Sequence, residues 1–346
     1  MNPLLQSAAI LLMVLSLFTA TVQAEEIITV MTHDSFDVSK EVIAVFEKEN
    51  GVKVRFLKSG DAGAALIQAI LSKNNPLADV FFGVDNTFLS RALTAGIFRP
   101  YNSPLLAVIP DHLKLDSKNR LLPVDYGDVC LNYDKAWFSK KGITPPTSLS
   151  DLIEPEYKGL TVVENPATSS PGMAFLLATI GKFGEDNYLQ FWKELRANDV
   201  VVAGGWEDAY FGHFTAASKG DRPIVVSYAS SPPAAVYYSE TPLKEAPTAA
   251  VVSAGDAFRQ IEFIGILEGT KKIALAEKFI DFMLSKPLQE DIPLKMFVFP
   301  SNKEAQLPEV FIQHAKVAQN PAMVAPERIE AMRDSWIDAW TTALLR

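Results

Sequence analysis

The sequence predicts an α/β protein of two lobes, each a mainly parallel sheet flanked by helices, with a ligand cleft between the lobes. Strand-like and helix-like stretches alternate over residues 26–95 and again over residues 121–233, which is typical of parallel sheets covered by helices. The 346 residues suffice for two domains. Small and polar residues follow most strand-like stretches, at the ends of strands where such sheets bind ligands.

The first unit is the more regular of the two. One of its helices repeats apolar residues at helical spacing, and its second strand alternates apolar and polar residues. In order, we expect a strand at 26–32, a helix at 37–49, a strand at 52–57, a helix at 60–73, a strand at 78–83 and a helix at 86–95.

The second unit begins with an extended stretch and ends after a strand that runs into Ser230-Ser231-Pro232-Pro233. A C-terminal helix carries Trp336 and Trp340 on one face, which favours a core position for both. In order, we expect an extended stretch at 121–133, helices at 149–153, 171–182, 186–197 and 206–217, strands at 161–163 and 224–228, strand-like stretches at 249–253 and 259–267, and helices at 270–284 and 327–345.

The order of these elements predicts a discontinuous first lobe. The chain enters the second unit near residue 125 and leaves it near residue 260. We therefore expect lobe 1 to comprise residues 25–124 with 262–346, and lobe 2 to comprise residues 125–261. The two crossovers are expected near residues 124–130 and 256–265.

Residues 1–24 have the layout of a secretory signal peptide that is cleaved after Ala24. An apolar stretch precedes small residues at Val22 and Ala24. This segment has no Lys or Arg, so an uncleaved N-terminal anchor is the alternative. The apolar stretch is short for a spanning helix. We expect the mature chain to be exported, extracytoplasmic (periplasmic) and soluble rather than membrane-embedded.

Charge and cysteine content exclude several classes. A formal net charge of −9 argues against a nucleic-acid partner. The single cysteine, Cys130, excludes an intramolecular disulfide and any Cys-rich metal site. Because Cys130 lies in an apolar run, we expect it to be a core residue.

Motifs of catalysis are missing from the sequence. It contains no G-x-S-x-G, P-loop, HExxH or C-x-x-C motif. Its four histidines are far apart, and His33 alone follows a strand-like stretch. We therefore predict that the protein is not an enzyme and has no cofactor, no catalytic residue and no bound metal.

Polar strand ends supply candidate binding residues. Thr168-Ser169-Ser170-Pro171-Gly172 precedes a helix, so its hydroxyls either cap that helix or bind an anion or hydroxyl. Trp206 follows two glycines, where its ring either packs in the core or stacks on a ligand. Four carboxylates at strand ends or crossovers cap helices or together favour a cation: Asp61, Asp85, Asp125 and Asp128.

Seven segments that occur in order carry a resemblance to a known family. They are Thr32–Phe36 (THDSF), Ala78–Asn86 (ADVFFGVDN), Val124–Lys135 (VDYGDVCLNYDK), Asn165–Gly172 (NPATSSPG), Gly204–Tyr210 (GGWEDAY), Val226–Pro232 (VSYASSP) and Phe297–Pro300 (FVFP). Over essentially the whole mature chain, the sequence resembles the periplasmic thiamine-binding proteins of ABC importers, which are related to ferric-iron binders.

The resemblance implies the type II fold of periplasmic binding proteins. It also implies capture of thiamine and its phosphate esters between the lobes and delivery to a membrane permease with a cytoplasmic ATPase. Carried over position by position, it places these residues at the ligand: Asp61, Ala62, Ser169, Ser170, Trp206, Tyr228, Ala229, Ser230, Ser231, Phe297 and His33.

The sequence departs from the family at several positions. His33 stands where the family commonly has Tyr, Ala234 where it has an aromatic residue, Ala62 where Gly is more common, and Asp128 where it has Tyr. A same-fold binder of ferric iron, a pyrimidine precursor or another small cation is therefore the alternative. A neighbouring tyrosine pair, 237–238, is the feature that favours iron.

Overall fold

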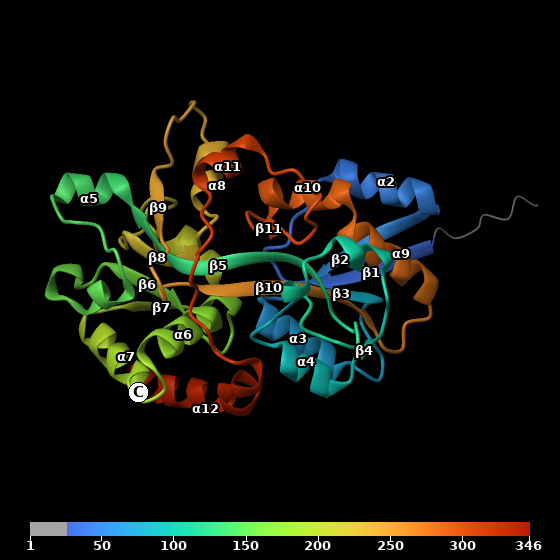
Figure 1. Cartoon of the computed structure of the whole chain (residues 1–346), viewed down its shortest axis with the longest axis horizontal. Coiled ribbons are helices and arrows are strands. Elements are labelled where there is room, and N and C mark those ends of the chain that lie inside the picture. Colours follow the sequence, from blue (N-terminus) through green and yellow to red (C-terminus); the bar gives the residue numbers. More distant parts are fainter. Residues whose placement is uncertain (1–25) are drawn as a thin grey trace, which may run out of the picture.

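The computed structural model describes residues 26–346, so the predicted signal peptide lies outside the described residues. Figure 1 shows helices on both faces of a strongly twisted sheet. Within the described part, eleven strands join in one sheet whose main order is β2-β1-β3-β10-β5-β8-β6-β7. The strands are β1 (Glu26–Thr32), β2 (Val52–Lys58), β3 (Val80–Asp85), β4 (Phe98–Arg99), β5 (Leu122–Asp134), β6 (Thr161–Glu164), β7 (Val201–Ala203), β8 (Ile224–Tyr228), β9 (Thr248–Val251), β10 (Phe258–Leu267) and β11 (Phe299–Pro300).

Parallel strands make up the two ends of this sheet, β2-β1-β3 and β8-β6-β7. Two antiparallel strands, β5 and β10, connect these ends and pair with each other from Phe258↔Val129 to Ile264↔Leu122. β10 also pairs with β3, and β5 also pairs with β8. This pair of long strands, which contains most of the residues where the crossovers were predicted, pairs with both ends of the sheet.

Eleven α-helices lie in the described residues. They are α2 (Lys40–Asn50), α3 (Ala62–Leu71), α4 (Leu89–Ala95), α5 (Lys135–Lys141), α6 (Ser170–Phe183), α7 (Tyr188–Ala197), α8 (Pro232–Tyr237), α9 (Ile273–Leu284), α10 (Lys286–Lys295), α11 (Glu309–His314) and α12 (Pro326–Leu345). Seven of the eleven match helices predicted from the sequence, in the predicted order, whereas α5, α8, α10 and α11 were not predicted. The helix expected at 206–217 is shorter than predicted, and its main part, η5 (Asp208–His213), is a π-helix. Gly212 disfavours a regular helix there, and Phe214 pairs with Arg222 just beyond it.

Two large hydrophobic cores lie in the described part of the chain. The first is built on β1, β3, β10 and α9, with Phe81, Phe263 and Phe279 at its centre. The second is built on β5, β8, α6 and α7, with Phe175 and Trp192 at its centre. Cys130 is fully buried on β5, as its apolar neighbours predict.

The C-terminal helix lies with the second core. Trp336 and Trp340 of α12 are buried, as predicted, and Trp340 packs edge-on against Trp192 of α7 at 5.6 Å between ring centroids. In Figure 1, α12 runs beside α7 and reaches toward α4. α12 therefore contacts helices of both parts of the molecule, with more of its packing on α7. The lobe boundaries themselves remain a prediction.

Candidate functional site

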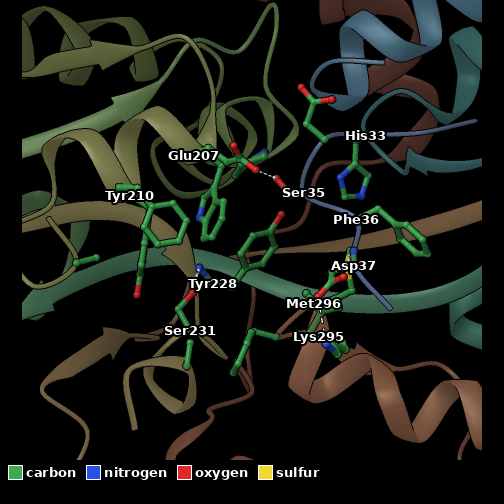
Figure 2. A pocket seen from close by; sticks show the side chains of 18 of the residues that line it. His33, Ser35, Phe36, Asp37, Glu207, Tyr210, Tyr228, Ser231, Lys295 and Met296 are labelled. Atoms are coloured by element: carbon green, nitrogen blue, oxygen red, sulfur yellow. Dashed lines mark hydrogen bonds and ion pairs between the residues drawn. The ribbon is translucent and has the colours of Figure 1, made fainter. Parts of the chain in front are cut away.

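A cavity of about 750 Å³ lies where the two parts of the molecule face each other. Its volume is in the range of small-molecule sites. Figure 2 shows side chains from both parts pointing into it. Its lining includes His33, Ser35, Lys58, Asp61, Ala62, Ser170, Trp206, Glu207, Tyr210, Tyr228, Ser231, Ala234, Tyr238, Gln260, Glu262, Met296 and Phe297.

A row of acidic residues crosses three strands at the floor of the cavity and behind it. Glu262 of β10 stands directly opposite Asp85 of β3 and opposite Asp125 of β5, so the three side chains share one face of the sheet. Glu262 lines the cavity, whereas Asp85 and Asp125 are buried behind it. Three adjacent carboxylates would repel one another if all were ionised.

The charges of this row are set by burial and by one imidazole. Burial, together with the charge of Glu262, raises the pKa of Asp125 well above its usual range. Burial also raises the pKa of Asp85 to about 6. Burial acts on Glu262 in the same sense, but His33 outweighs it and holds the Glu262 pKa below its ordinary value. At neutral pH Glu262 is therefore ionised and Asp85 is largely ionised, whereas Asp125 favours its neutral form.

His33 follows β1 and lines the cavity beside this row. Its Nε2 lies 3.2 Å from Glu262 Oε1. Burial disfavours the imidazolium, yet the Glu262 carboxylate more than compensates and raises the His33 pKa. Gly83 makes room for the ring, since a Cβ on that glycine would lie 2.5 Å from His33 Cδ2.

Asp61 connects the first part of the molecule with the second. It caps α3, where its Oδ1 accepts the Ala62 N–H at 2.7 Å. Its other oxygen faces Gly205, where a Cβ would lie 2.9 Å away. Burial raises the Asp61 pKa, and the bond from Ala62 opposes that shift. The paired glycines before Trp206 thus allow this carboxylate to approach the second part closely.

The start of α6 faces the same corner of the cavity. Ser170 lines the cavity and donates a hydrogen bond from its hydroxyl to Asp85, which also accepts the Thr87 N–H at 2.6 Å. Ser169 precedes it as the N-cap residue but is fully buried. The hydroxyl of Ser170 thus joins the carboxyl end of β3 to the N-terminus of α6.

An aromatic wall forms the side of the cavity that belongs to the second core. Trp206 stacks on Tyr210 with ring centroids 5.0 Å apart and 24° between the ring planes. Its Nε1 donates to Ser227 Oγ at 2.9 Å, which fixes the rotation of the indole. Tyr228 donates to Gln260 Oε1 at 3.3 Å, and its ring lies over Gly127, where a Cβ would come within 2.7 Å.

The opposite rim is formed by α8 and the segment before β11. Phe297 has a left-handed backbone with φ of 53°, which a bulky residue rarely adopts. Its ring lies 5.6 Å from that of Tyr238. Ser231 accepts the Tyr228 N–H at 3.1 Å, and Ala234 lines the cavity at the position where the family commonly has an aromatic ring.

Most of the residues that the sequence placed at a ligand line this cavity. Eight do so: His33, Asp61, Ala62, Ser170, Trp206, Tyr228, Ser231 and Phe297. Three others, Ser169, Ala229 and Ser230, are fully buried and are absent from the lining. Sequence reasoning had no means of telling which of several adjacent small residues at a strand end faces the cleft.

Several lining residues escaped the sequence reasoning. Glu262 and Gln260 lie in an apolar strand, where a polar residue is itself a signal. Tyr210 follows Trp206 by four residues and could have been paired with it. Of the other carboxylates proposed to favour a cation, Asp128 is occupied elsewhere, because Arg259 donates to it twice at 2.9 Å.

Among residues 26–346, no group of three or more His, Cys, Asp or Glu side chains could hold a metal ion. Tyr237 and Tyr238 are half exposed or more, and their rings pack edge-on against each other at 5.1 Å. No helix of the same range has both the length and the apolar character needed to cross a membrane.

A cavity between two cores, joined by a pair of shared strands and lined by aromatic and polar groups, is the architecture of a two-lobed ligand-binding protein. The model of the bacterial extracellular solute-binding protein family matches residues 75–317. The chain belongs to this family.

Individual relatives agree with this assignment. The chain is 32% identical over 337 residues to the thiamine-binding periplasmic protein of Salmonella typhimurium, covering 96% of this chain and 98% of the relative. It is 29% identical to the protein of the same name from Haemophilus influenzae, covering 94% and 95% of the two chains.

Solved structures share the fold. A periplasmic thiamin binding protein superposes with a TM-score of 0.83 at 28% identity, covering 94% of this chain and 98% of the other. A ferric binding protein from Campylobacter jejuni reaches a TM-score of 0.74 at 19% identity, covering 91% and 99%. The expected type II periplasmic binding fold is therefore confirmed.

Proposed function

We propose that this protein captures thiamine in the cleft and delivers it to the membrane permease of an ABC importer after export to the periplasm. The observation that carries the proposal is the 32% identity, over 96% of the chain, to a protein named for thiamine binding. Such identity over the full length makes a shared ligand the simplest expectation. We propose no catalytic step, because the family is one of solute-binding proteins.

The chemistry of the cavity supports this ligand. Thiamine combines a thiazolium cation, a flat aminopyrimidine and a hydroxyethyl tail. The exposed faces of Trp206 and Tyr228 suit flat or cationic rings. The ionised Glu262 supplies a negative charge on the floor. We propose that the eight lining residues predicted from the sequence contact the ligand, with Ser169, Ala229 and Ser230 supporting them from behind.

The tail of the ligand is best placed at the corner where α3 and α6 begin. Ala62 and Ser170 are the first residues of these helices, and both line the cavity. N–H groups in the first turn of a helix bind hydroxyl or phosphate oxygens; because Asp61 already accepts the Ala62 N–H, the other N–H groups of these two first turns would make the contact. Asp61 stands at the same corner and would oppose a phosphate if ionised. We therefore propose that thiamine binds more tightly than its diphosphate.

The test is calorimetry with the chain that begins at Glu25, prepared free of ligand by unfolding and refolding. Thiamine, its monophosphate, its diphosphate and the free aminopyrimidine are titrated in turn. Heat of binding with thiamine is expected, and the absence of heat with all four compounds would refute the proposal. Ferric salt serves as the control for the alternative ligand, because tyrosinate ligation would produce a visible charge-transfer band.

Export is tested separately from binding. The full-length chain is expressed in a Gram-negative host, and the protein is recovered from the periplasmic fraction. The intact mass should correspond to a chain that begins at Glu25. A protein retained in the membrane fraction with residue 1 still present would instead support the uncleaved anchor.

A further inference from the structure

The two ring nitrogens of His33 have different surroundings. Nε2 is buried and lies 3.2 Å from Glu262 Oε1, at ion-pair distance, so it faces the protein. Nδ1 forms no hydrogen bond to any residue of the described range 26–346, and the side chain lines the cavity. Figure 2 shows the imidazole at the edge of the cavity among the other lining side chains. Nδ1 is thus the atom that His33 can offer to a ligand.

The orientation of the ring is fixed by its neighbours. The edge that carries Cδ2 lies against Gly83, which has a φ of 108° and no Cβ. Phe82 packs on the ring with centroids 5.6 Å apart. Because the carboxylate of Glu262 only accepts hydrogen bonds, it favours the ring orientation and tautomer in which Nε2 carries a proton.

This arrangement has a chemical consequence for the atom that faces the ligand. When His33 is protonated, both nitrogens carry hydrogen and Nδ1 donates. When His33 loses a proton, Glu262 keeps the remaining hydrogen on Nε2, so that Nδ1 exposes a lone pair and accepts. Titration of His33 therefore reverses the hydrogen-bonding polarity of Nδ1 as well as removing a charge.

We propose that His33 is a specificity-determining residue that reads the hydrogen-bonding edge of the ligand's heteroaromatic ring, as a donor when protonated and as an acceptor when neutral. This inference rests on the proposed function. An aminopyrimidine has a ring-nitrogen acceptor next to an amino donor, so its edge can meet either state of Nδ1. A ring whose donor and acceptor positions are exchanged would pair with the protonated and the neutral state of His33 through the opposite atoms.

Other groups around His33 also respond to pH. Asp61 faces it from the start of α3, and Lys58 faces it from the end of β2. Behind Glu262 lie Asp125 of β5 and Asp85 of β3. Their charges act on any thiazolium cation to a similar extent. A ratio of affinities between two ligands with the same cation therefore cancels most of their effect and isolates the contact to the ring edge.

The experiment compares thiamine with its 4-oxo analogue, in which the amino donor becomes an acceptor and the adjacent ring nitrogen becomes a donor. Both dissociation constants are measured by calorimetry over a pH series that runs from below the ordinary imidazole pKa to well above it, because Glu262 raises the His33 pKa. Their ratio should change by about fivefold or more, the contribution of one hydrogen bond. The direction of the change identifies whether Nδ1 meets the ring nitrogen or the group at position 4.

Three variants separate His33 from its surroundings. In His33→Gln the ratio should be independent of pH, because the amide donates and accepts at every pH. Glu262→Gln removes the preference for one tautomer and should reduce the pH dependence. Asp85→Asn is the matched control, since it removes a nearby group that titrates at about pH 6 and should leave the pH dependence of the ratio in place.

The outcomes are distinct. A ratio that does not change with pH in the wild-type protein, or that changes equally in His33→Gln, would overturn the inference while leaving thiamine binding intact. Failure of both compounds to bind would overturn the proposed function and the inference with it. Thermal melts of each variant establish that it is folded, and Glu262→Gln provides the second test if His33→Gln is not.

Discussion

Replacement of Trp206 by alanine tests the aromatic wall most directly. The indole is held by its stack on Tyr210 and by the hydrogen bond from Nε1 to Ser227. A ligand ring that covers its free face would remove roughly 100 Å² of apolar surface from water, worth about 2.5 kcal/mol. Part of that gain offsets the ordering of the ligand. The expected loss is about 1–3 kcal/mol, or about 5- to 150-fold in Kd.

The assay is calorimetry with thiamine, supported by tryptophan fluorescence. Of the five tryptophans, Trp206 is the one that lines the cavity in the described part of the chain. Binding should therefore quench the wild-type protein, and Trp206→Phe should abolish most of this quenching while it keeps an aromatic face. Trp137→Phe, on α5 outside the lining, is the matched control and should bind like wild type.

One result would refute the reasoning. If Trp206→Ala is folded, as judged by its thermal melt, and binds thiamine with unchanged affinity, the indole has a structural role alone. The ligand would then have to lie against other aromatic residues of the lining, such as Tyr228 and Phe297. An equal loss in Trp206→Ala and Trp206→Phe would point instead to the hydrogen bond with Ser227, which both variants remove.

Three further changes test the surroundings of the site. Gly83→Ala places a methyl group against His33 and strains a left-handed backbone. We therefore expect the free energy of unfolding in urea to fall by about 2 kcal/mol or more. Calorimetry should also show weaker thiamine binding. Asp128→Asn leaves Arg259 without its carboxylate partner and should cost about 2–3 kcal/mol in urea unfolding; a change below about 0.5 kcal/mol would contradict this. Folding raises the Asp85 pKa from 3.8 to about 6. Its protonated form therefore stabilises the folded protein below about pH 4, and this contribution is lost as pH rises through 6. We expect Asp85→Asn to have a higher melting temperature than wild type at pH 8 but not at pH 4.

Much of the fold could be predicted because its signals are local. The run that became β3 is apolar at nearly every position, which is typical of a strand buried on both faces. The Asp61 cap marked the start of α3 to within two residues. The long stretch that became β5 also had no helical spacing. Each of these signals is contained in about ten consecutive residues.

The remainder depended on contacts between distant segments. The amphipathic pattern of α12 revealed an apolar face but not its partner, which is α7 of the second core. Glu262 became part of the site only because the register of β10 places it between Asp85 and Asp125. Ser169 and Ser170 are adjacent in the sequence, and only the path of the chain into α6 decides that Ser170 faces the cavity.

The strand pair β5–β10 also determines when the first core can form during synthesis. β10 is the inner neighbour of β3, yet it comes from residues 258–267, after all of β5 to β9. A growing chain therefore exposes the unpaired edge of β3 until most of the polypeptide has left the ribosome. Such long-range pairing slows folding. Late completion of the sheet suits a chain that, as we propose, crosses a membrane before it folds.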